Sequence, residues 1–229
     1  MLPPEAINEG PPVTPRPSAT VLLVRGRDPW ELVLVHRPGG SDFAAGAYVF
    51  PGGTVHAGDM PWGDEIRMAA VREVFEEVGI LLARRGRRFA RQAESDGVGS
   101  LVEGGKSFGV ALRELRLEPA LDSLVMFARW VTPLQLRRRF DARFSLARLP
   151  SGQEVRPQEG EVTDWLWISP SNALTSPEIT LVYATRSVLE SVAPHKDAAR
   201  LFSRARRLKE VPIVEPKMIQ TETGWEITH

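Results

Sequence analysis

The stretch Arg72-Glu73-Val74-Phe75-Glu76-Glu77-Val78-Gly79-Ile80 says more about the fold than any other part of the chain. Successive residues of an α-helix are rotated by about 100°, so apolar residues spaced three or four apart share one face. Working outward from the stretch, that face contains Ile66, Ala70, Val71, Val74 and Val78. The pattern predicts a helix over residues 64–78, and Gly79 stands where its C-terminus is expected.

Three carboxylates lie beside this apolar face. Glu73, Glu76 and Glu77 fall within an arc of about 100°, and like charges at such spacings repel one another. A divalent cation would compensate them, and carboxylate oxygens suit a hard ion such as Mg²⁺ or Mn²⁺. The alternative is an acidic face in contact with solvent, which is the commoner role of a Glu-rich helix. The glycine turn that precedes the helix, Phe50-Pro51-Gly52-Gly53, favours the metal interpretation.

The turn and the helix together resemble the Nudix box, the motif of the Nudix hydrolase superfamily. In that pattern, Gly is followed after five residues by Glu, and after seven more by Arg-Glu-U-x-Glu-Glu-x-Gly-U, where U is a bulky aliphatic residue. Residues 72–80 match every specified position of the second half. The resemblance covers roughly residues 18–175.

The first half of the box departs from the pattern. Counted from Gly53, the acidic position falls on Asp59, and twelve residues rather than seven then precede Arg72. Counted back from Arg72, the same spacing falls on Asp64 and Gly58. Either the loop carries a five-residue insertion or the acidic position has shifted. Asp64 has a further alternative role as the N-cap of the helix.

The lengthened loop is similar to the Nudix branch that includes the coenzyme A diphosphatase-like proteins. Ser41-Asp42-Phe43, followed by Tyr48-Val49-Phe50-Pro51-Gly52-Gly53, carries the same resemblance. Arg37 and Gly46 match the spacing of the coenzyme A signature found upstream of the box in related enzymes, whereas Asp42 stands where a second arginine is expected.

The resemblance implies an α/β (α+β) fold, an α/β/α sandwich with a mixed β-sheet. It also implies metal-dependent hydrolysis of a diphosphate linkage in a small-molecule nucleoside diphosphate derivative, with Mg²⁺ or Mn²⁺ as cofactor. Coenzyme A or acyl-CoA ranks slightly ahead of ADP-ribose or NADH-like substrates. A non-catalytic Nudix domain that senses a nucleotide is the rival, although this chain retains all three helix glutamates.

Matching position by position, the resemblance makes Glu76 and Glu77 metal ligands and Glu73 a further ligand or the base for water. The carbonyl of Gly52 would complete the metal shell, and Gly53 belongs to the substrate-binding turn. Arg72 would orient the glutamates. The alternative role of Arg72 is an ordinary ion pair on a helix. This differs little from the first role, because an ion pair with a glutamate also holds that glutamate in place.

Residues outside the box are also candidates for the site. A distant carboxylate from a later loop would be Glu159 or Glu161, with Glu161 preferred because it adjoins an expected strand. Arg37 and Arg143 are candidates for phosphate binding, because a guanidinium can bind phosphate through two hydrogen bonds. The run Arg137-Arg138-Arg139 is expected to be solvated.

Other parts of the chain show strand and helix patterns. Strands are expected at residues 19–24, 31–36, 124–131, 140–146 and 164–168, with a hairpin connection over residues 25–30. Helices are expected at 107–115, 181–192 and 197–208, and residues 92–106 are expected to form a loop or short helices. Trp165 and Trp167 share one face of a strand, which favours core packing over base stacking.

We expect a proline-rich arm at residues 1–17, a Nudix domain at 18–175 and a C-terminal helical extension at 176–229 packed on the same domain. The 29 basic and 29 acidic residues balance, which argues against a nucleic-acid polymer as partner. No cysteine is present, so thiolate metal sites are excluded. The lack of a long apolar run and of a secretory signal predicts no membrane partner and a cytoplasmic location. The arm and the extension could serve a homodimer.

Overall fold

The computed structural model describes residues 6–40, 44–157, 162–221 and 224–228. A mixed β-sheet forms the centre, with strand order β10-β2-β1-β9-β8-β11. Its strands are β1 (Arg16–Gly26), β2 (Trp30–His36), β8 (Val125–Val131), β9 (Phe140–Arg148), β10 (Asp164–Ile168) and β11 (Ile213–Val214). β1 pairs in parallel with β9 and antiparallel with β2, so the sheet is mixed, as expected.

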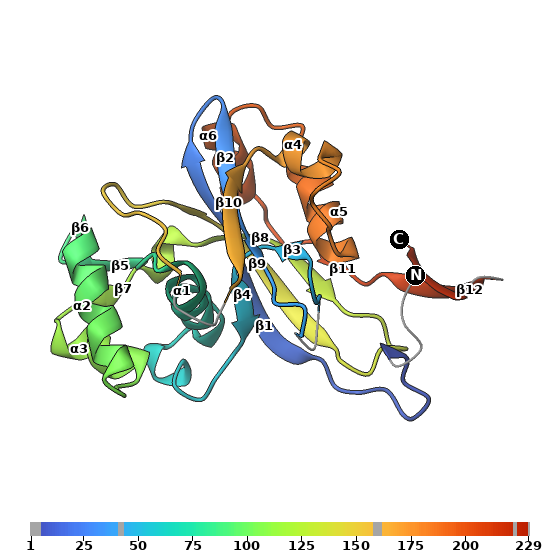
Figure 1. Cartoon of the computed structure of the whole chain (residues 1–229), viewed down its shortest axis with the longest axis horizontal. Coiled ribbons are helices and arrows are strands. Elements are labelled where there is room, and N and C mark those ends of the chain that lie inside the picture. The colour runs from blue at the N-terminus through green and yellow to red at the C-terminus, as the bar shows by residue number, and fades with distance from the viewer. Residues whose placement is uncertain (1–5, 41–43, 158–161, 222–223, 229) are drawn as a thin grey trace.

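Helices cover both faces of this sheet (Figure 1). On one side lie α1 (Glu65–Val78), α2 (Gln92–Glu103) and α3 (Phe108–Glu114), and on the other lie α4 (Pro170–Thr175), α5 (Tyr183–Val192) and α6 (Ala198–Arg206). The expected α/β/α sandwich is confirmed.

Two apolar cores follow from the alternation of side chains along β1, because neighbouring residues of a strand point to opposite faces. Val21 and Leu23 belong to the core beneath α1, whereas Leu22 and Val24 belong to the core beneath α5 and α6. Trp165 and Trp167 both pack against the first core, so their expected packing role is confirmed.

Strand β1 changes its neighbour along its length. Near its C-terminus it pairs with β2, whereas near its N-terminus it pairs with β4 (Gly52–Thr54). The short strand β3 (Tyr48–Val49) pairs instead with the end of β2. The chain therefore crosses from β2 to β1 at Pro51, whose carbonyl accepts a hydrogen bond of 2.8 Å from the Val21 amide. This crossing places the glycine turn in the gap between two strands.

Helix α1 is buried on several sides because it lies between the main sheet and a lobe of residues 83–119. The lobe contains α2, α3 and a small sheet of β5 (Ala83–Arg85), β6 (Arg88–Phe89) and β7 (Glu118–Pro119). Phe75 of α1 stacks on Phe108 of α3 with ring centroids 5.1 Å apart. Polar side chains of α1 are therefore partly shielded from water. They need hydrogen-bond or ion-pair partners, because an unpaired buried polar group costs free energy.

Residues 92–106 contain a twelve-residue helix, α2, where the sequence indicated a loop or short helices. Gly97 and Gly99 lower the helix propensity of this segment. Both face neighbouring elements at ordinary van der Waals distance: a Cβ on Gly97 would lie 3.4 Å from Leu115, and one on Gly99 would lie 3.9 Å from Phe75. Packing against neighbouring elements thus outweighs the local propensity.

The proline-rich arm pairs more than the sequence indicated. Strand β1 begins at Arg16, and Ile7 forms an isolated bridge with Leu136. The expectation of a solvated run at residues 137–139 is wrong for Arg139, which is 8% exposed. Its guanidinium donates to the carbonyls of Val13 and Thr132, so it joins the arm to the β8–β9 connection.

The C-terminal segment contains the two expected helices, α5 and α6, and further strands that the sequence did not indicate. β11 joins the main sheet beside β8, and β12 (Lys217–Thr221) pairs with β13 (Gly224–Thr228). These strands are short, and Pro212 and Pro216 flank β11, which leaves little periodicity to detect. The boundaries at residues 17 and 175 stay a prediction.

Candidate functional site

The glycine turn approaches two neighbours so closely that side chains would not fit. A Cβ on Gly52 would lie 2.4 Å from the carbonyl oxygen of Ala19, and one on Gly53 would lie 2.4 Å from a carboxylate oxygen of Glu73. Glycine therefore lets the turn pack onto β1 on one side and onto the carboxylate of α1 on the other. This contact brings the turn and the helix together at one point.

Arg72 is the centre of the polar network on α1. Its Nη1 donates to Glu73 Oε1 at 2.7 Å and to Glu76 Oε2 at 2.8 Å. Its Nε and Nη2 donate to the two carboxylate oxygens of Asp59 at 3.1 and 3.0 Å, and Nη2 also donates to the Thr54 carbonyl at 2.8 Å. A single guanidinium thus links the turn, the loop after it and two carboxylates of the helix.

Burial and neighbouring charges shift the pKa values of Glu73 and Arg72. Burial raises the pKa of Glu73, and the positive charge and hydrogen bond of Arg72 oppose that shift without cancelling it. Burial alone would lower the pKa of Arg72, but the hydrogen bond to Asp59 and the charges of Glu73 and Glu76 raise it overall. Arg72 therefore stays cationic and fixes the carboxylates around it.

The two aspartates that compete for the first acidic position have different surroundings. Asp64 caps α1, because its Oδ1 accepts from the Arg67 amide at 3.0 Å. Asp59 is 1% exposed and accepts from Arg72 and from the His56 amide. This geometry agrees with the count in which Gly53 begins the box, Asp59 is its first acidic residue and the inserted residues follow Asp59.

The inserted residues form a short 3₁₀ helix, η2 (Met60–Trp62), that packs away from the glycine turn. The guanidinium of Arg113 on α3 lies over the Trp62 ring, 4.8 Å from its centroid. A Cβ on Gly109 would lie 3.2 Å from Trp62 Nε1. The extra length of the loop is therefore used to dock it on the lobe that covers α1.

Glu77 and Arg37 meet on the other side of the turn. Glu77 Oε2 accepts from the Gly52 amide at 2.9 Å, and Arg37 Nη1 lies 3.8 Å from Glu77 Oε1. Arg37 follows the end of β2, so the strand crossing at Pro51 is what brings these residues together. A phosphate bound beside Glu77 would be within reach of a guanidinium with two parallel donors.

Arg143 lies on the face of the main sheet that α1 covers, but further from α1 than Gly53 does. Gly53, Ala19 and Arg143 occupy one row across β4, β1 and β9, so about 10 Å separates the backbones of the first and last. Arg143 Nη1 pairs with Asp141 at 3.2 Å. The structure thus brings Arg37 to the box carboxylates and leaves Arg143 two strands away from the glycine turn.

The donors on α1 fit a hard divalent cation by their chemistry, since Glu73, Glu76, Glu77 and the Gly52 carbonyl all offer oxygen. Within the ranges that the structure describes, no three acidic or histidine side chains already converge as a metal site. Glu73 and Glu76 turn toward Arg72 instead. The ligand set stays a prediction, and Glu159 and Glu161 lie outside the described residues.

Two contributors were not identified from the sequence. The Thr54 carbonyl contacts Arg72, and the His56 amide contacts Asp59. Both are backbone groups, so residue type gives no signal for them; only the position of the loop after Gly53 points to them.

Comparison with known proteins places this geometry in a family. A sequence profile described as the NUDT19 Nudix domain matches residues 60–185, more than half of the chain, and one of the NUDIX domain matches residues 14–96. The chain belongs to the Nudix family. Within it, the chain falls in the coenzyme A diphosphatase-like branch that the lengthened box indicated, and that expectation is confirmed.

Individual Nudix relatives agree with this placement. The chain is 27% identical to a putative Nudix hydrolase 7 of Caenorhabditis elegans, over 69% of the chain and 52% of that protein. It is 36% identical to the human acyl-coenzyme A diphosphatase NUDT19, over 54% of the chain and 36% of that protein. The match therefore spans about half of one relative and about a third of the other.

Solved structures of other Nudix hydrolases have a similar fold. A crystal structure of a Nudix hydrolase from Alicyclobacillus acidocaldarius superposes with a TM-score of 0.70 at 27% identity, covering 83% of this chain and 96% of that one. A Nudix hydrolase from Nitrosomonas europaea shares the fold at 10% identity and a TM-score of 0.50, covering 90% of this chain and 80% of that one. In this Nudix chain, none of the helices in the described ranges has the length and apolar character needed to cross a bilayer.

Proposed function

We propose that this Nudix domain hydrolyses a diphosphate linkage in a nucleoside diphosphate derivative, with coenzyme A or acyl-CoA as the preferred substrate class. The observation that carries the proposal is the Arg72 network, which gathers Asp59, Glu73 and Glu76 against the glycine turn. Similarity to the human acyl-coenzyme A diphosphatase supports the substrate class.

Each residue of the network has a proposed task. Glu76 and Glu77 hold Mg²⁺ or Mn²⁺ together with the Gly52 carbonyl, and Glu73 is a further ligand or the base for water. A cation held by these residues would neutralise phosphate oxygens and lower the pKa of a bound water. Arg72 touches no substrate and keeps Glu73 and Glu76 side by side.

Binding of the diphosphate is proposed to take place beside the metal ligands, where Arg37 lies next to Glu77. Arg37 beside Glu77 supplies a bidentate donor, and Gly53 belongs to the turn assigned to substrate binding. Arg143, on the same sheet face, is proposed to contact a more distant part of the substrate. A homodimer and a cytoplasmic location, both expected from the sequence, remain proposals.

A substrate panel tests the activity. The purified chain is incubated with Mn²⁺ or Mg²⁺ and coenzyme A, an acyl-CoA, ADP-ribose or NADH, and products are identified by mass. We expect 3′,5′-ADP and a 4′-phosphopantetheine product; AMP instead would favour the ADP-ribose or NADH class. Tight nucleotide binding without any product would favour the sensing role.

Matched glutamine variants test the site. Replacing Glu76 or Glu77 with Gln removes one carboxylate charge without changing its size, so we expect turnover to fall by about 100-fold or more. Glu65→Gln, in the first turn of the same helix and outside the network, is expected to stay within about twofold. Unchanged metal-dependent hydrolysis in both Glu76→Gln and Glu77→Gln would overturn the assignment.

A further inference from the structure

A second charged surface lies on α6, across the sheet from the box carboxylates. Arg200, Arg204 and Arg207 are spaced by four and three residues, so they project from one face of the helix within an arc of about 60°. All three are exposed, and none makes an ion pair with another residue in the described part of the chain. Their charge is therefore directed to solvent.

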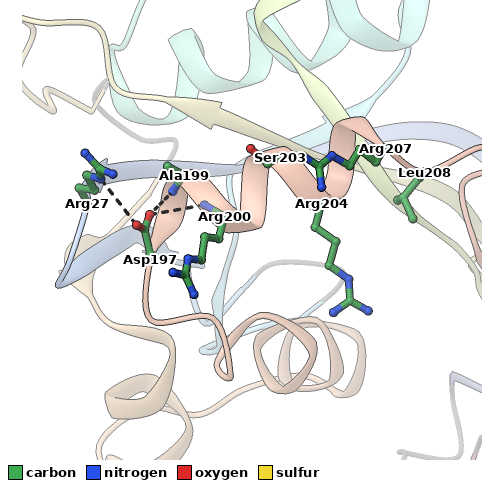
Figure 2. Close-up of a pocket in the computed structure, with 8 residues that line it drawn as sticks. All are labelled: Arg27, Asp197, Ala199, Arg200, Ser203, Arg204, Arg207 and Leu208. Carbon is green, nitrogen blue, oxygen red and sulfur yellow. Dashed lines mark hydrogen bonds and ion pairs between the residues drawn. The ribbon is translucent and has the colours of Figure 1, made fainter.

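A fourth arginine comes from a different element. Arg27, in the connection between β1 and β2, lines the same hollow of about 630 Å³ as the three arginines of α6. Figure 2 shows Arg27 beside Asp197 at the start of α6, with Arg200 and Arg204 extending from the same side of the helix. We call Arg27, Arg200, Arg204 and Arg207 the α6 arginine face.

The arginines are held in place by the fold, because the opposite face of α6 is buried. Leu201, Phe202 and Ala205 pack into the second core. The carbonyl of Arg27 accepts from the Ala198 amide at 3.0 Å, which ties the β1–β2 connection to α6. The backbone of Arg27 thus keeps its place relative to the backbone of α6.

A single carboxylate lines the hollow, and it is already in use. Asp197 Oδ1 caps α6 through the Ala199 amide at 2.6 Å, and its Oδ2 lies 3.6 Å from Arg27 Nε. One carboxylate among the four arginines that line the hollow leaves a local excess of positive charge. The pKa of His195 is lowered, first by burial and then by the charge of Arg204, in agreement with that excess.

We propose that the α6 arginine face binds a compact anion that carries two or three linked phosphate groups. Arg200 and Arg207 are about 10 Å apart along the helix, which suits a short phosphate chain rather than a long polymer. Guanidinium groups bind phosphate oxygens through paired hydrogen bonds, and several of them share the charge of such a group. The ligand is either a free polyphosphate compound or the phosphorylated headgroup of a lipid.

This site is separate from the proposed catalytic site. α6 covers the core that contains Leu22 and Leu146, whereas α1 covers the core that contains Val21 and Leu23. The two helices lie on opposite sides of the sheet (Figure 1). Binding at α6 therefore needs no metal, and its test does not depend on hydrolysis.

Calorimetry with inorganic tripolyphosphate in buffer with EDTA tests the site. Without metal, the carboxylates of α1 repel an anion, so binding there is suppressed. We expect binding that weakens with salt and falls at least tenfold in Arg204→Ser/Arg207→Ser, because two charge-assisted contacts are lost. Arg87→Ser/Arg186→Ser, which removes two exposed arginines elsewhere, should change the affinity less than twofold.

The position of binding is read from backbone amide chemical shifts, which should change at Ala199 and Ser203 in the wild-type chain. A far-ultraviolet melting curve establishes that the double variant is folded. Absence of tripolyphosphate binding by the wild-type chain, or an equal loss in both double variants, would overturn the proposal.

Sedimentation with vesicles separates the two sources of phosphate. Vesicles of phosphatidylcholine with about 20% of a diacylglycerol diphosphate, a lipid whose headgroup carries two linked phosphates, are compared with vesicles of pure phosphatidylcholine. Binding to the anionic vesicles that Arg204→Ser/Arg207→Ser loses identifies a lipid headgroup. Tripolyphosphate binding without vesicle binding identifies a free compound.

Discussion

The carboxylate of Asp59 receives two hydrogen bonds from the guanidinium of Arg72, at 3.1 and 3.0 Å, with both side chains almost fully buried. The pair joins the loop after the glycine turn to the middle of α1. Because Arg72 also holds Glu73 and Glu76, the position of the loop and the position of the proposed metal ligands are coupled through one side chain.

The first prediction concerns this pair. Asp59→Asn leaves the buried Arg72 with one charge fewer around it, and we expect the free energy of unfolding to fall by about 2–4 kcal/mol in chemical denaturation. Asp64→Asn is the matched control, since Asn caps a helix as well as Asp and the Arg67 ion pair is half-exposed; its loss should be within about 0.5 kcal/mol. Equal losses would contradict the assignment of Asp59 to the first acidic position.

The sequence was informative where signals are local. The apolar spacing of α1 and its end at Gly79 were readable, because each depends on a few neighbouring residues, and the helix cap was one of the two roles left open for Asp64. The choice between Asp59 and Asp64 was not, since the five inserted residues break the spacing. Only the three-dimensional contact with Arg72 distinguishes them.

Misjudged segments were those decided by distant contacts. α2 forms despite two glycines because it packs on neighbouring elements. Arg139 belongs to a basic run, but its guanidinium donates a hydrogen bond to the Val13 carbonyl of the N-terminal arm. For Arg143, the residue type suggested phosphate binding, but its place on β9 about 10 Å from Gly53 follows only from strand register.

The second prediction compares alanine variants of Gly53 and Gly58, the two glycines at which the Nudix box can begin. In Gly53→Ala, the new methyl group meets the Glu73 carboxylate, which is the end of a flexible side chain and can move. We expect the fold to persist and kcat/KM to fall by about 10- to 100-fold, because Glu73 is displaced. In Gly58→Ala, nothing lies within 4 Å of the new group, so activity should stay within about twofold. The reverse order would favour a box that starts at Gly58.

The third prediction measures metal binding without turnover. If Glu77 is a ligand, Mg²⁺ or Mn²⁺ at ten times its dissociation constant stabilises the fold by about 1.4 kcal/mol, which raises the Tm by about 3–5 °C. Glu77→Gln should abolish most of that increase, whereas Glu65→Gln should retain it. The same increase in Glu77→Gln would exclude Glu77 from the ligand set.

The fourth prediction concerns the inserted residues. Trp62→Ala removes the ring that Arg113 covers and that packs near Gly109, so we expect a loss of about 2 kcal/mol in the free energy of unfolding. Met60→Ala is the control within the same insertion, because that side chain is 61% exposed, and it should cost less than about 0.5 kcal/mol. Similar values for the two variants would mean that the insertion is not anchored through Trp62.

The fifth prediction concerns acid stability at the start of α2. The hydrogen bond from Arg88, with further help from Arg85 and the Arg91 amide, lowers the pKa of Glu94 from 4.5 to about 2. A carboxylate with a lowered pKa stabilises the fold above its unfolded pKa, and that contribution disappears as the pH falls from about 4.5 through about 2. Wild type should therefore exceed Glu94→Gln in stability at pH 7, with the difference shrinking toward pH 2.5 in urea titrations. Glu103→Gln, an exposed residue at the other end of α2, serves as control, and a Glu94→Gln difference that does not change with pH would show that its ion pairs do not stabilise the lobe.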